Sequence, residues 1–110
     1  MKPGEVYMVE VPFSNRPGSK VRPVVVLRTF DDGYFAGAAS TSQIKPNLRL
    51  LHSVDFSGKR YGEIRKKGLS GVSNFYEKAV KLLPIAPSAR LIGMLDDCDF
   101  SAIMHGLGLA

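Results

Sequence analysis

The chain has 110 residues, a single cysteine and a formal net charge of +5 at pH 7. This length suits one domain with a real core and is too short for two, so we expect a single domain over residues 1–110. Hydrophobic residues make up 45% of the sequence and charged residues 23%, which argues against a disordered chain. The positive charge is compatible with an anionic partner such as nucleic acid, a membrane surface or an acidic protein.

The sequence carries no signal for export or membrane insertion. Cys98 is the only cysteine, which excludes an internal disulfide and is typical of a reducing compartment. No apolar segment follows the charge of residues 1–5, and no apolar run approaches membrane-spanning length. We therefore expect a soluble protein of the cytoplasm that does not associate with membranes.

Two strands are predicted in the first thirty residues. Residues 5–11 are rich in β-branched and aromatic side chains and end at Pro12. Residues 13–21 carry prolines, glycine and serines, which is the composition of a loop. The second strand, over about residues 22–28, begins at Pro23, which cannot donate a ladder hydrogen bond and is placed best at a strand start.

The middle and the end of the chain predict four further strands. The sequence Asp31-Asp32-Gly33 favours a hairpin turn, so residues 34–41 should pair with the preceding strand. Residues 48–56, 73–83 and 90–95 also have strand composition, and a turn with two positive charges falls at 57–60. The basic run 65–68 either continues the basic surface or forms a solvated strand edge.

One helix is predicted, at the C-terminus. Asp96 and Asp97 supply an N-cap and suit the positive end of the helix dipole. An apolar stripe at helical spacing would pack on the sheet and consists of Phe100, Ile103, Met104 and Leu107. Gly106 and Gly108 end the helix. Several short strands and one terminal helix predict a mainly β fold, a small and partly open β-barrel.

Two residues are predicted to share one end of this sheet. Arg22 begins a strand and Thr41 ends its antiparallel neighbour, so they are natural cross-strand neighbours. A fixed guanidinium beside a hydroxyl donor can stabilise the negative charge of a phosphoryl transition state. The alternative is a surface arginine paired with a local carboxylate.

The sequence contains no pattern for a metal or a nucleotide cofactor. His52 and His105 are isolated, and neither a phosphate-binding loop nor a dinucleotide glycine pattern is present. We therefore expect no metal and no cofactor.

Five segments form an ordered set along the chain: residues 4–9 (Gly-Glu-Val-Tyr-Met-Val), 18–27 (Gly-Ser-Lys-Val-Arg-Pro-Val-Val-Val-Leu), 39–43 (Ala-Ser-Thr-Ser-Gln), 68–73 and 93–95. In these segments the chain resembles the MazF/PemK toxins of type II toxin–antitoxin systems. Any one segment is unspecific, but the ordered set covers essentially the whole chain. The sequence departs from the pattern of the family in residues 74–87, which contain Phe75-Tyr76-Glu77 and two prolines.

The resemblance implies an SH3-like barrel that forms a homodimer and cleaves single-stranded RNA at specific sequences without a metal. The ribose 2′-hydroxyl would be the nucleophile, leaving a 2′,3′-cyclic phosphate and a 5′-hydroxyl. The family's essential arginine and hydroxyl residue correspond to Arg22 and Thr41. The side chains expected to bind RNA are Arg16, Ser19, Lys20, Ser42, Gln43 and Lys45. An acidic, partly disordered antitoxin would be the protein partner.

Two other classes of function stay open on the sequence. One is a non-catalytic relative that binds an antitoxin or nucleic acid without cleaving it. The other is a gyrase poison like CcdB, which shares the barrel, would need no arginine–threonine pair and would act through the C-terminal helix.

Overall fold

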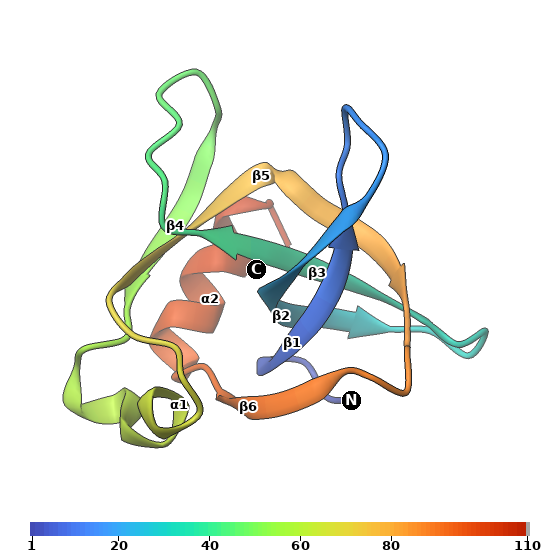
Figure 1. Cartoon of the computed structure of the whole chain (residues 1–110). Helices are drawn as coiled ribbons and strands as arrows, with labels where there is room; N and C mark the ends of the chain where they lie inside the picture. The colour runs from blue at the N-terminus through green and yellow to red at the C-terminus, as the bar shows by residue number, and fades with distance from the viewer. Residues whose placement is uncertain (110) are drawn as a thin grey trace.

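The computed structural model describes residues 1–109 and contains six strands and three short helical segments. The strands are β1 (Glu5–Pro12), β2 (Ser19–Thr29), β3 (Tyr34–Thr41), β4 (Leu50–Asp55), β5 (Val72–Pro84) and β6 (Arg90–Met94). The helical segments are the 3-10 turn η1 (Lys59–Tyr61) and the α-helices α1 (Gly62–Lys66) and α2 (Asp97–Gly106). Figure 1 traces these elements from the N- to the C-terminus.

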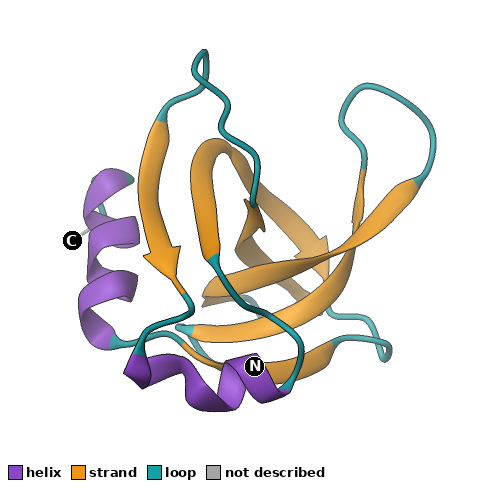
Figure 2. Cartoon of the chain, turned by 60° about the vertical axis from the view of Figure 1, so that its left-hand side comes forward, coloured by secondary structure: helices purple, strands orange, loops and turns teal. Residues whose placement is uncertain are grey.

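All six strands belong to one antiparallel sheet in the order β4-β5-β3-β2-β1-β6. Over residues 1–109 the edge strands β4 and β6 do not pair with each other, so the sheet curls without closing into a barrel. Register shifts occur between Val26 and Arg28 of β2 and between Ala38 and Ser40 of β3. Such irregularities bend strands and increase their twist, which accounts for the curled shape in Figure 2. The predicted mainly β fold with a C-terminal helix is confirmed at this level.

The strand alternation of β2 and β3 divides the core between the two faces of the sheet. Val25 and Ala38 point to the face covered by the helices, while Val24 and Ala39 point to the other face. The helix-covered face holds the larger cluster, which includes Val54, Phe56, Ile64, Phe75 and Ile103. The opposite face holds a smaller cluster of Val9, Val11, Val24, Val26, Phe35, Ala39 and Leu83. Arg22 and Thr41 are two residues from Val24 and Ala39 along their strands, so they lie on the same face of the sheet as the smaller cluster.

The C-terminal helix is confirmed in position and orientation. The Asp96 side chain caps it by accepting a hydrogen bond of 3.2 Å from the Cys98 backbone N–H. Ile103 is fully buried, and Phe100, Met104 and Leu107 pack around the larger cluster. The predicted apolar stripe therefore does lie on the sheet, and Figure 2 shows α2 lying along the outside of the curled strands.

Most strand predictions are confirmed, with shifted ends. β3 has the predicted bounds, whereas β2 begins three residues before the predicted Arg22 because Ser19 pairs with Pro12 across the hairpin. β4 is shorter than predicted and β5 extends one residue further at each end. Gly33 has a φ of 85°, which suits glycine in the tight turn between β2 and β3.

The prediction of a single helix is wrong, because residues 59–66 also form helical turns. Tyr61 and Ile64 are buried there, and the Tyr61 ring packs edge-on against Phe56 at 4.9 Å between centroids. Arg65 belongs to this helix instead of a solvated strand edge, and it donates to the backbone oxygens of Phe56 and Gly58. Long-range burial stabilises a segment too short to show helical periodicity.

Candidate functional site

Two loops rise from the same end of the sheet, and strand β5 crosses between them (Figure 1). The first loop joins β1 to β2, and the second, residues 42–49, joins β3 to β4. A groove of about 580 Å³ lies between these loops over the smaller core cluster. Its floor includes Ala39 and Thr41 of β3 and Ala79 of β5. The β1–β2 hairpin loop and the crossover connection from β3 to β4 therefore enclose a concave surface at one end of the molecule.

The groove is lined with cations and, among the described residues, with no carboxylate. The cationic side chains are Arg16, Lys20, Arg22, Lys45, Lys78 and Lys81. They come from the β1–β2 loop, β2, the β3–β4 loop and β5, so the charge gathers only when the sheet forms. Like charges at this density favour a polyanionic solute, because their mutual repulsion is relieved when an anion binds.

Arg22 is the most enclosed arginine of this set. It lies in β2 opposite Val9 of β1 and is half-buried, whereas Arg16 is exposed. No ion pair joins Arg22 to any carboxylate in residues 1–109, which leaves its guanidinium free for a solute. The alternative of an arginine paired with a local Asp or Glu is therefore not what the structure contains.

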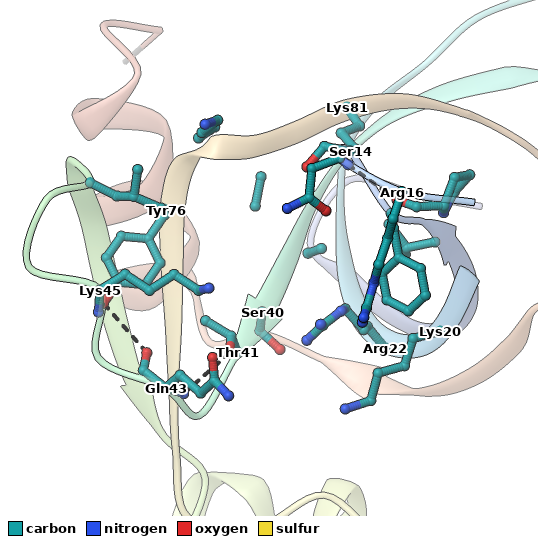
Figure 3. Close-up of a pocket in the computed structure, with 18 residues that line it drawn as sticks. Ser14, Arg16, Lys20, Arg22, Ser40, Thr41, Gln43, Lys45, Tyr76 and Lys81 are labelled. Atoms are coloured by element: carbon teal, nitrogen blue, oxygen red, sulfur yellow. Dashed lines mark hydrogen bonds between the residues drawn. The ribbon is translucent and has the colours of Figure 1, made fainter. Parts of the chain in front are cut away.

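Thr41 lies beside Arg22 on the neighbouring strand. The register pairs Val24 with Ala39. Arg22 comes two residues before Val24 and Thr41 two residues after Ala39, and because the strands are antiparallel, both lie on the same side of that pair. The Ser40 hydroxyl donates to the Pro23 carbonyl oxygen at 3.3 Å and so links β3 to β2 next to Thr41 and Arg22. Figure 3 shows Ser40 and Thr41 between Arg22 on one side and Gln43 on the other. The predicted proximity of Arg22 and Thr41 is thus present.

A second, smaller hollow adjoins the groove across this pair. It has a volume of about 330 Å³ and shares Lys20, Arg22, Ser40, Thr41 and Gln43 with the groove. Its remaining lining is mostly hydroxyl-bearing, apolar or glycine: Val21, Pro23, Ser42, Gly68, Leu69, Ser70, Val72 and Ser73. Arg22 and Thr41 therefore form a ridge between a strongly basic groove and a weakly charged hollow.

The predicted RNA-binding residues divide into those that line these hollows and one that does not. Arg16, Lys20, Gln43 and Lys45 line the groove, and Ser42 lines the second hollow. The Arg16 guanidinium lies 4.2 Å from the centroid of the Phe13 ring, a cation–π contact that holds it over the groove. Ser19 lines neither hollow, because its hydroxyl donates to Glu10 across the β1–β2 hairpin.

Three polar groove residues of β5 were not identified from the sequence: Tyr76, Lys78 and Lys81. Lys81 donates to the Pro12 backbone oxygen at 3.3 Å and so links β5 to the β1–β2 loop. The available signal was the two lysines, which have strand-forming apolar residues on either side. It could not be used because the irregular pairing after Ala38 decides which side chains face the groove.

The main cluster of interacting titratable groups outside the groove lies beneath α2. Asp99 accepts from the Tyr61 hydroxyl, and its other carboxylate oxygen lies 2.8 Å from His52 Nε2. The Asp96 backbone N–H donates to the Tyr61 hydroxyl at 3.0 Å, and Arg60 pairs with the Asp96 carboxylate. Burial, together with the hydrogen bond to Asp99, raises the pKa of Tyr61. This cluster joins α2 to β4 and η1 and leaves little capacity for a ligand.

Residues 1–109 contain no group of three or more His, Cys, Asp or Glu side chains arranged to hold a metal ion. No helix in that range is long and apolar enough to cross a membrane. Comparison with known proteins finds no matching family model and no matching curated protein.

Proposed function

We propose that this protein is an endoribonuclease that cleaves single-stranded RNA without a metal and acts as the toxin of a type II toxin–antitoxin system in the cytoplasm. The observation that carries the proposal is the ridge of Arg22 and Thr41. An unpaired, half-buried guanidinium lies there beside a hydroxyl, at the meeting of a basic groove and a weakly charged hollow. The fold is proposed to be an opened relative of the SH3-like barrel.

The groove suits a flexible polyanion. Six cations without a carboxylate among them can follow a phosphate backbone, and binding would release the counterions of that backbone. The groove also contains the half-buried Phe13, whose ring offers an apolar surface beside the cations. Single-stranded RNA combines the required charge with bases that can leave their stack and enter a hollow.

The chemistry follows from placing a phosphodiester at the ridge. The 2′-hydroxyl gives up its proton to water as its oxygen attacks phosphorus, the bond to the 5′-oxygen breaks, and that oxygen takes up a proton from water as it leaves as a 5′-hydroxyl. Negative charge grows on the non-bridging oxygens, where Arg22 and the Thr41 hydroxyl would donate hydrogen bonds. Guanidinium remains charged under ordinary conditions, so Arg22 would hold the phosphate instead of removing the 2′-hydroxyl proton.

The test is to incubate the purified protein with a long single-stranded RNA in excess chelator and to map the new ends. We expect discrete cuts with 5′-hydroxyl termini, and a loss of at least about 10²-fold in Arg22→Ala, as for other transition-state donors. Arg28→Ala is the matched control, because Arg28 is an exposed arginine of the same strand outside both hollows. Intact RNA with the folded wild type, or equal cutting by Arg22→Ala, would overturn the proposal.

Two partners belong to this proposal through the family resemblance: a second copy of the chain and an acidic antitoxin. An acidic segment could occupy the same groove as RNA, because both present negative charge to the same cations. Analytical sedimentation of the purified protein tests whether it forms a dimer. A competition assay between RNA and an acidic peptide tests whether the antitoxin would bind the groove.

A further inference from the structure

The loop that follows Thr41 is exposed to solvent but tied to β5 at several points. Every residue from Ser42 to Asn47 is exposed, and Ile44 keeps 84% of its surface accessible. Nevertheless, the Arg49 backbone oxygen accepts from the Glu77 N–H at 2.9 Å, and the Arg49 and Glu77 side chains form an ion pair. Backbone bonds of this kind restrict a loop that carries almost no buried side chain of its own.

Two buried side chains of β5 make the closest attachment. Tyr76 is 4% exposed, and its hydroxyl accepts from the Lys45 backbone N–H at 2.8 Å and lies 3.4 Å from the Gln43 backbone oxygen. Asn74 is 7% exposed and donates to the same Gln43 oxygen at 3.2 Å. The Asn74 amide oxygen in turn accepts from the Ser53 hydroxyl of β4 at 2.6 Å.

These contacts leave Tyr76 and Asn74 satisfied only while the loop keeps this conformation. Throughout the described part of the chain, every buried side-chain nitrogen and oxygen has a hydrogen-bond partner. If the loop moved away, the buried Tyr76 hydroxyl and the Asn74 amide nitrogen would lose their partners, which is costly in a low-dielectric setting. The β5 side chains therefore select one loop conformation.

The selected conformation determines what Thr41 presents to the groove. The Gln43 backbone N–H donates to the Thr41 side-chain oxygen at 3.1 Å, a contact drawn in Figure 3. A hydroxyl that accepts from an amide keeps its own hydrogen for donation elsewhere. Because Gln43 is also the residue held by Asn74 and Tyr76, the orientation of the Thr41 hydroxyl depends on β5.

We propose that Tyr76 and Asn74 are positioning residues, which clamp the β3–β4 loop through Gln43 and Lys45 and thereby hold the Thr41 hydroxyl toward the scissile phosphate. The proposal rests on the ribonuclease function proposed above. Neither side chain is a catalytic residue, because their polar atoms already bind the loop and β4. Their contribution is to keep a catalytic hydroxyl in its productive geometry.

Tyr76→Phe tests the clamp, because it removes one oxygen and leaves the buried ring. We expect kcat for RNA cleavage to fall about tenfold and KM to change less than about twofold, since five of the six groove cations lie outside this loop. We also expect the Lys45 amide to exchange with solvent at least about tenfold faster. The Glu77 amide, which donates to Arg49, should keep its protection.

Tyr61→Phe is the matched control. Tyr61 is also almost fully buried, at 3% exposure, and its hydroxyl also joins two groups, but it lies beneath α2 away from the groove. We expect this variant to lose stability while its kcat and its Lys45 exchange stay at the wild-type values. Equal effects of the two substitutions on kcat would mean a general structural loss and would overturn the positioning role.

Amide exchange separates this inference from the ribonuclease proposal. If the wild type cuts RNA and Tyr76→Phe cuts it equally well, the positioning role is refuted while the ribonuclease stands. If the wild type cuts no RNA, the ribonuclease proposal fails and exchange still tests the clamp. Unchanged Lys45 exchange in Tyr76→Phe would then refute the clamp, and faster exchange would support it.

Discussion

The two faces of the curled sheet differ in whether their charged side chains are paired within the chain. On the helix-covered face, Asp99 bonds to Tyr61 and His52, and Asp96 pairs with Arg60, so polar groups find partners within the chain. On the groove face, six cations gather with no carboxylate among them, and Arg22 has no ion pair in the described chain. Charges paired within the chain are not available to a solute, whereas unpaired charge at a concave surface is. The contrast assigns binding to the groove face, and the larger apolar cluster assigns stability mainly to the helix-covered face.

The largest effect should come from a cavity on the helix-covered face. Ile103 of α2 is fully buried, and Ile103→Ala should lower the free energy of unfolding by about 2–5 kcal/mol through lost burial and the cavity left behind. Denaturant unfolding measures this loss. Ser101→Ala, at an exposed position of the same helix, should change stability by less than about 0.5 kcal/mol. A loss below about 1 kcal/mol in Ile103→Ala would contradict the assignment of stability to this face.

A smaller loss, with a defined pH dependence, should follow from Tyr61→Phe. The substitution removes the hydroxyl that joins Asp99 to the Asp96 backbone, at a cost of about 1–2 kcal/mol near neutral pH. The pKa of Tyr61 is raised from 10.0 in the folded state, so the protonated hydroxyl contributes stability below pH 10. That contribution disappears as the pH rises above 10, because the unfolded tyrosine ionises first.

Unfolding of wild type and Tyr61→Phe should therefore be compared near neutral pH and above about pH 10. We expect the stability difference between the two proteins to shrink at the higher pH. Using the difference removes the contribution of other groups that ionise in this range. A gap that stays constant or widens would show that Tyr61 does not have this role.

The smallest effect should come from single cations of the groove face. Lys78→Ala and Lys81→Ala should each weaken binding of single-stranded RNA and reduce the salt slope of the affinity by about 0.7, the value for one phosphate contact. Neither substitution should alter stability much, because Lys78 is exposed and Lys81 makes one exposed hydrogen bond. Lys59→Ala, in η1 outside both hollows, is the control. A slope unchanged in both groove variants would place the RNA elsewhere.

The hairpins and the terminal helix were predictable because their signals are local. The turn at Gly33 joins β2 to β3, and this hairpin brings Arg22 and Thr41 to the same end of the sheet. The register shift between Val26 and Arg28 then sets their alignment. Asp96 caps α2, and the spacing of its apolar residues identifies the buried side. The helical turns at 59–66 were missed, because their stability comes from distant contacts. A Cβ on Gly93 of β6 would lie 2.3 Å from Ile64 Cγ1, so α1 depends on a glycine almost thirty residues away.

The composition of the groove depended on the same kind of distant contact. Neighbouring residues in the chain were enough to place Arg22 and Thr41 at one end of the sheet, since a hairpin turn is a short-range property. Their alignment also depends on the register shift between Val26 and Arg28. The cations of β5 reach the groove from a distant part of the chain. The hydrogen bonds that attach Gln43 and Lys45 to Asn74 and Tyr76 also join residues about thirty positions apart. Only the folded sheet decides these, because its irregular register sets which β5 side chains face the groove and which groups need partners.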